Sequence, residues 1–118
     1  MKRKVKSLER LTKAQKMAHD LARHRHAVAE LNKTALEQKQ ADVLAALGRD
    51  EFGFGALASI VTNCARRLDM EISAADQELV RRREESIRQG ARANVAGELL
   101  SDARKSMVER ALRSELGE

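Results

Sequence analysis

Three histidines lie close together in the sequence, at His19, His24 and His26, and histidine is a common metal ligand and proton carrier. Asp20 and His24 are four residues apart and would share one face of a helix, while His19 and His26, seven apart, would share another. A zinc site needs about four converging ligands, and neither pair provides them without another segment. We therefore interpret the histidines as polar or boundary residues, and we predict no metal site.

The only cysteine, Cys64, lies at helical spacing between Val61 and Leu68. This spacing predicts a core position, where a thiol behaves as a small hydrophobic group. No histidine is near it in the sequence, and we find no Ser/His/Asp set, phosphate loop or carboxylate pair with which to argue for catalysis. We predict that the protein is not an enzyme and uses no cofactor. A single cysteine also excludes an internal disulfide and suits the cytoplasm.

The stretch "GFGALA", residues 53–58, matches the loose pattern G-x-G-x-x-A of dinucleotide-binding folds. That pattern binds a pyrophosphate only when a strand precedes it and a helix follows. Here the preceding residues, "KQADVLAALG", are typical of a helix that ends at Gly48, with Asp50 as a possible N-cap for the next helix. We predict the bend of a helical hairpin, with Phe52 or Phe54 filling the end of the interface.

The composition predicts long helices: 35% of the residues are charged, 2% are aromatic, and there is no proline. We expect an all-α fold, a single antiparallel two-helix coiled-coil hairpin over residues 1–118. It would have a helix at 5–47, a turn at 48–55 and a longer helix at 56–116. Gly90 and Gly97 would weaken the second helix by about 1 kcal/mol each relative to alanine. One continuous helix is preferred to a break at Gly90 or Gly97, and a further alternative is a new helix starting at "SAAD", residues 73–76.

Apolar residues recur at steps of three and four, which places them on one face of each helix. In the first helix the predicted seam is Leu8, Leu11, Ala14, Met17, Leu21, His24, Val28, Leu31 and Ala35, followed by Leu36, Val43 and Leu47. In the second it is Leu57, Val61, Cys64, Leu68, Ile72, Ala75 and Leu79, and then Ile87, Ala91, Val95, Leu99, Ala103 and Met107.

The formal net charge is +5, with both ends basic and the middle acidic. Candidate partner-binding residues are the basic clusters Lys2, Arg3 and Lys4, and Arg81, Arg82 and Arg83. The second cluster could instead pair with Glu84, Glu85 and their neighbours. Nucleic-acid recognition is weakly supported because aromatic side chains for base stacking are absent. No apolar run is long enough to span a membrane, and the basic start lacks the apolar stretch of a secretory signal.

A bend near residue 52 would bring the first residues opposite residue 100, so that the following segment would project beyond the hairpin. Its apolar stripe comprises Met107, Val108, Ala111, Leu112 and Leu116. An alanine-rich two-helix rod buries little apolar area and should be marginal as a monomer. We therefore expect this segment to dock on a protein partner or on a second copy, which leaves a homodimer open.

The layout resembles the coiled-coil stalk proteins of type III export systems, the FliJ/YscO type. The similarity lies in "KRKVKSLERLTKAQKMAHDLA", in the long first helix and in the return helix after "EFGFGAL". It is a similarity of pattern without a diagnostic motif. The resemblance implies a stalk that inserts into the ring of the export ATPase and binds export chaperones. A dimeric structural coiled-coil adaptor and a basic nucleic-acid-associated protein remain as alternatives.

Overall fold

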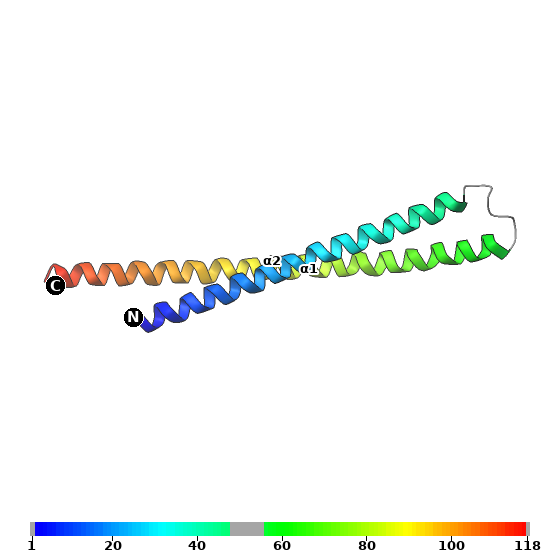
Figure 1. Ribbon diagram of the computed structural model, residues 1–118. Helices are drawn as coiled ribbons and strands as arrows, with labels where there is room; N and C mark the ends of the chain where they lie inside the picture. Colours follow the sequence, from blue (N-terminus) through cyan, green and yellow to red (C-terminus); the bar gives the residue numbers. More distant parts are fainter. Residues whose placement is uncertain (1, 48–55, 118) are drawn as a thin grey trace. The chain divides into compact units, whose positions relative to one another are not determined.

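The computed structural model describes residues 2–47 and 56–117, which form two helices and no strand (Figure 1). Helix α1 spans Lys2–Leu47, and helix α2 spans Ala56–Glu115. Thus α1 begins three residues before its predicted start, and α2 ends one residue before its predicted end. The predicted turn at 48–55, with both phenylalanines, lies outside the described residues.

Helix α2 is continuous for 60 residues and passes through Gly90, Gly97 and the segment 73–76 without a break. The expectation of one long helix is therefore confirmed. Strong helix formers and the absence of proline compensate for the two glycines. Helix α2 ends at Glu115, and Gly117, two residues later, has a φ of 77° in the left-handed region that glycine adopts without a steric penalty.

Contacts between α1 and α2 form two units, which are described separately. The terminal unit comprises Met1–Arg23 and Glu84–Glu118. In it, Glu9 Oε1 lies 3.1 Å from Arg104 Nη2, and Thr12 Oγ1 donates a hydrogen bond of 3.2 Å to the carbonyl oxygen of Ala96. Rising numbers on α1 pair with falling numbers on α2, so the two segments are antiparallel.

The central unit is His24–Arg83. In it, Lys33 Nζ lies 2.7 Å from Asp76 Oδ1, and the Gln40 side-chain amide donates a hydrogen bond to Asp69. These pairs are again antiparallel. The predicted all-α fold with antiparallel helix pairing is confirmed.

The contact face of the terminal unit contains small and polar residues at coiled-coil spacing. On α1 the buried or half-buried positions include Val5, Leu8, Thr12, Gln15, His19 and Ala22. On α2 they include Ser86, Gln89, Ala93, Ala96, Leu100, Ala103 and Met107. The largest apolar cluster forms around Val5, Leu100 and Ala103, with Leu8 and Met107 packed against it.

The central unit repeats this spacing. Its buried or half-buried positions on α1 are His26, Ala29, Lys33, Leu36, Gln40 and Val43. On α2 they include Val61, Ala65, Leu68, Ile72, Ala75, Leu79 and Arg82. Alanine provides much of the contact in both units, and each buried alanine contributes little apolar area. The helix interface is therefore narrow and only weakly hydrophobic.

Much of the predicted α1 seam is wrong. Leu8, Leu36 and Val43 do face α2, but the other members with a described side chain are exposed: Leu11, Ala14, Met17, Leu21, His24, Val28, Leu31 and Ala35. Met17 remains 64% exposed and Leu21 49%. Two faces of α1 satisfy the spacing of three and four. The face that packs is the one whose small side chains allow close approach and bring Thr12 within reach of the Ala96 carbonyl.

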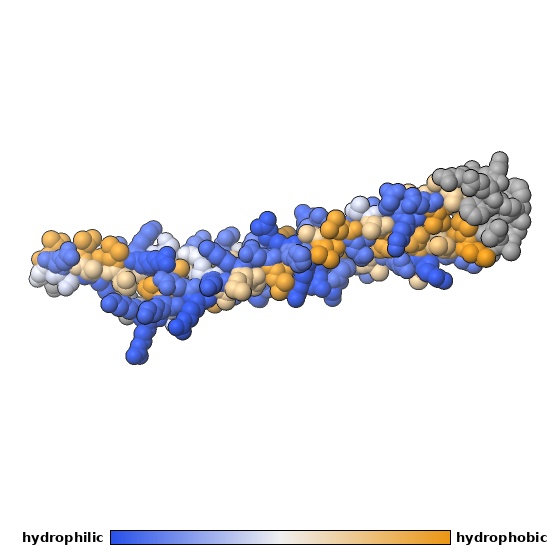
Figure 2. All heavy atoms as spheres, in the orientation of Figure 1, coloured by the Kyte–Doolittle hydropathy of each residue, from blue (hydrophilic) through white to orange (hydrophobic). Residues whose placement is uncertain are grey.

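The α2 seam is predicted better in its first half than in its second. Val61, Leu68, Ile72, Ala75, Leu79, Ala103 and Met107 are buried or half-buried, as expected. Cys64, Ile87, Ala91, Val95 and Leu99 are exposed, contrary to expectation. Figure 2 shows hydrophobic residues that reach the visible surface between hydrophilic ones.

Candidate docking surfaces

The three histidines have three different environments. His19 is half-buried in the terminal unit, where its ring lies against Gly90. His24 is exposed, and His26 Nε2 lies 3.4 Å from Glu30 Oε1 on the next turn of α1. Over residues 2–47 and 56–117, no three His, Cys, Asp or Glu side chains come together as a metal site would require. His19 and His26 act here as interface residues.

Cys64 is exposed, so its predicted core position is wrong. The seam at this point runs through Val61, Ala65 and Leu68, which places the neighbouring residue 64 on the outside of α2.

The predicted basic clusters differ in how far they are neutralised. Lys2, Arg3 and Lys4 are exposed at the start of α1. Arg81 Nη2 lies 2.5 Å from Glu78 Oε2, and Arg82 Nε lies 2.7 Å from Glu78 Oε1. The hydrogen bond from Arg81, helped by that from Arg82, holds the pKa of the Glu78 carboxyl below its ordinary value.

Arginines 81 and 82 therefore pair with a neighbouring carboxylate, as one interpretation of the sequence proposed. Arg83, the third member of the cluster, is exposed. Of the two basic clusters, the one at Lys2, Arg3 and Lys4 is the more open to an acidic partner.

The apolar segment near the end of α2 is only partly uncovered. Met107, which the sequence placed both at the end of the seam and in the projecting segment, is half-buried and packs against the cluster of Val5, Leu100 and Ala103. Val108, Ala111, Leu112 and Leu116 are exposed, and the last turns of α2 extend past the start of α1 (Figure 1). The exposed stripe is therefore shorter than predicted by one residue, Met107.

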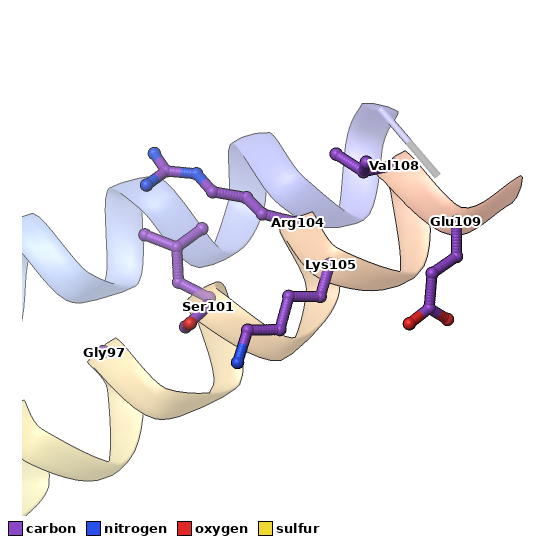
Figure 3. A pocket seen from close by; sticks show the side chains of 7 residues that line it. Gly97, Ser101, Arg104, Lys105, Val108 and Glu109 are labelled. Carbon is purple, nitrogen blue, oxygen red and sulfur yellow. The ribbon is translucent and has the colours of Figure 1, made fainter. Parts of the chain in front are cut away.

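An open groove of about 460 Å³ lies beside this stripe. Its lining includes Gly97, Ser101, Arg104, Lys105, Val108 and Glu109. Figure 3 shows Arg104 and Val108 on the side nearer to α1, and Lys105 and Glu109 on the side away from it. Arg104 is paired with Glu9, and Lys105 and Glu109 border the groove together with Val108.

A second groove in the terminal unit is mostly apolar, and we call it the Leu99 groove. One part, of about 400 Å³, is lined by Leu11, Gln15, Arg88, Arg92, Val95 and Leu99, among others. A further part, of about 340 Å³, shares Leu99 and continues along Lys4, Leu8, Asp102 and Arg110. The Gln15 side-chain oxygen is buried without a hydrogen-bond partner among the described residues.

The central unit has a groove of about 400 Å³ lined by Leu36, Ala74 and Ala75 and bordered by Glu71 and Glu78. The charges at this groove thus differ from those at the first part of the Leu99 groove. Arg88 and Arg92 line that part, whereas Glu71 and Glu78 border the groove of the central unit. In the same unit, a hydrogen bond from Lys33 to Asp76 raises the pKa of Lys33.

Sequence reasoning assigned Leu11, Val95 and Leu99 to the interior, so it missed the Leu99 groove. One signal could have revealed it. Arg88, Arg92 and Asp102 lie at helical spacing with Val95 and Leu99, and so many charges on one face are typical of a face in contact with solvent.

The sequence matches no known protein family and no curated protein, and the structure matches no solved structure. No described helix has a stretch long and apolar enough to cross a membrane.

Proposed function

We propose that this protein is a non-enzymatic helical-hairpin docking protein, and that it acts as a stalk of the type III export kind. It would couple to the export ATPase and bind export chaperones in the cytoplasm. The observation that carries the docking role is the exposure of Leu21, Leu112 and Leu116 beside a weakly hydrophobic helix interface. A helix pair that buries alanines and leaves several leucines exposed has apolar surface available for a protein partner.

The export role is supported by the resemblance described above and by the exposed charges of the terminal unit. Lys2, Arg3 and Lys4 offer positive charge to an acidic surface, and Leu112 and Leu116 lie at the same end of the unit. Charge would guide the encounter, and apolar contact would hold the complex.

The test measures ATP hydrolysis by the export ATPase of the source organism with and without the protein. We expect stimulation that is lost in Lys2→Glu/Lys4→Glu and in Leu112→Glu/Leu116→Glu. The matched control is Arg10→Glu/Lys13→Glu, which changes the net charge by the same amount at other exposed positions of α1. No stimulation, together with no binding of export chaperones, would reject the export role.

A structural adaptor is the second candidate function, and the exposed apolar residues of α2, Ile87 and Val95 among them, favour it. An adaptor needs the helix pair and its outer face but no ATPase. Retained assembly in vitro without any effect on the ATPase would support this alternative.

A further inference from the structure

The exposed face of α2 between residues 88 and 102 has an ordered pattern. Arg88, Arg92, Val95, Leu99 and Asp102 follow one another at steps of four and three, so they form a single stripe along the helix. All five are exposed, and four of them line the first part of the Leu99 groove. The stripe has the spacing of a coiled-coil seam, although α1 packs on a different face.

Charge changes sign along this stripe. Arg88 and Arg92 lie before Val95, and Asp102 lies after it, with Glu98 exposed next to Leu99. No ion pair involves any of these four charged residues in the part of the chain that the structure describes. The face thus has a basic segment before Val95 and an acidic segment after it, and Leu99 lies within the acidic segment.

An antiparallel second copy would complement this face. If a two-fold axis passes beside Val95, a residue that precedes position 95 in one copy lies opposite a residue of the second copy. That residue follows position 95 by the same number of positions. Arg88 then lies opposite Asp102 of the second copy, and Arg92 lies opposite Glu98. Ala91 lies opposite Leu99, a small side chain against a large one, and Val95 meets its own counterpart. Because the operation is two-fold, each ion pair occurs twice.

Other arrangements of the same face fit less well. A parallel pair in register would place like charges opposite each other along the stripe, which is destabilising. An acidic helix from another protein would pair with Arg88 and Arg92 but would oppose Glu98 and Asp102. The charge order of the face therefore favours a second copy of this chain.

We propose that the protein forms a two-fold symmetric homodimer through the Leu99 groove, with the two α2 helices antiparallel and centred on Val95. Leu11 of each copy adds apolar contact at the edge of the interface, because it lines the groove beside Val95 and Leu99. The dimer does not depend on the proposed export role, so a monomeric protein would leave that role open.

Charge reversal tests the dimer without altering the helix interior. Sedimentation equilibrium on the full chain should give twice the monomer mass of 13.2 kDa at about 100 µM, where a dimer with a micromolar Kd is nearly saturated. Arg88→Glu/Arg92→Glu makes the face wholly acidic, and Glu98→Arg/Asp102→Arg makes it wholly basic. Each should raise Kd by about 10- to 100-fold.

Mixing the two reversed proteins should restore association as a heterodimer, and the fourfold variant that carries all the changes should form a homodimer again. The control Lys6→Glu/Lys13→Glu alters exposed residues of α1 and should dimerise like the original. Circular dichroism would verify that each variant stays helical. A monomeric original protein, or a dimer insensitive to both reversals, would overturn the proposal.

Cysteine cross-linking locates the axis independently. In a Cys64→Ser background, Val95→Cys should form a disulfide-linked dimer on mild oxidation, because a residue at the axis meets its own counterpart. Val108→Cys is the matched control, since Val108 is exposed at another position of α2. Cross-linking through position 108 and not 95 would overturn the proposed interface.

Discussion

His19 packs against Gly90 where α1 and α2 meet in the terminal unit. A Cβ atom built on Gly90 would lie 3.1 Å from Nε2 of the imidazole ring, closer than most such contacts in proteins. Gly97, one heptad further along α2, has no atom within 4 Å of an added Cβ. The two glycines thus occupy equivalent helix positions with different surroundings.

The first prediction compares alanine at these two glycines. Gly97→Ala should raise the free energy of unfolding by about 1 kcal/mol, because alanine is the better helix former and the space is open. Gly90→Ala should give a smaller gain or none, since the ring of His19 must move. Chemical denaturation followed by circular dichroism would measure both. Equal gains would show that the contact between His19 and Gly90 is unimportant.

The second prediction concerns the buried hydrogen bond between the helices. Thr12→Val keeps the shape of the side chain but removes the donor to the Ala96 carbonyl, so it should lower the free energy of unfolding by about 1 kcal/mol. Thr34→Val is the control, because Thr34 is exposed and bonds only to Glu30 one turn earlier. Thermal denaturation would compare the two. A similar effect at both sites would contradict the predicted difference.

The third prediction is a pH dependence in the central unit. The hydrogen bond to Asp76 raises the pKa of Lys33 above its ordinary value of 10.5. A raised lysine pKa adds stability that is fully present below 10.5 and is lost as the pH rises through the folded-state value. The stability difference between the original protein and Asp76→Asn should therefore shrink at alkaline pH.

Denaturation curves between neutral pH and pH values above 10.5 would measure this difference. Lys39→Met provides the control, because Lys39 is an exposed lysine on the same helix. The free energy of unfolding of Lys39→Met should differ from that of the original protein by a constant amount over the same pH range. If the difference for Asp76→Asn is constant as well, the ion pair between Lys33 and Asp76 adds no stability.

The helices and their pairing could be predicted from the sequence because they depend on local chemistry. The region before Gly48 contains no glycine or proline, and the glycines at 90 and 97 are too few to end α2. A long helical run on each side of a glycine-rich bend then leaves antiparallel pairing as the simplest way to bury a stripe.

The face used for packing could not be predicted in the same way. Both Leu8–Thr12–Gln15 and Met17–Leu21–His24 have coiled-coil spacing, and ranking by hydrophobicity selects the second, which is exposed. The contact depends on close approach at alanines such as Ala22 and Ala96 and on the hydrogen bond of Thr12. These are three-dimensional properties of two facing helices. The Leu99 groove was missed for the same reason, because its residues were assigned to the interior.

The last prediction concerns Gln15, a polar residue on the contact face. Its side-chain oxygen is buried and has no hydrogen-bond partner among the described residues, and such a group destabilises the fold by about 1–3 kcal/mol. Gln15→Leu has a similar volume and removes the unpaired group, so it should raise the free energy of unfolding. Gln77→Leu, at an exposed position of α2, should change stability little.

Because Gln15 also lines the Leu99 groove, denaturation should be followed at several protein concentrations. A gain independent of concentration belongs to the helix pair itself, whereas a gain that grows with concentration belongs to association. Loss of stability in Gln15→Leu would mean that the glutamine oxygen is hydrogen-bonded, through water or a second chain.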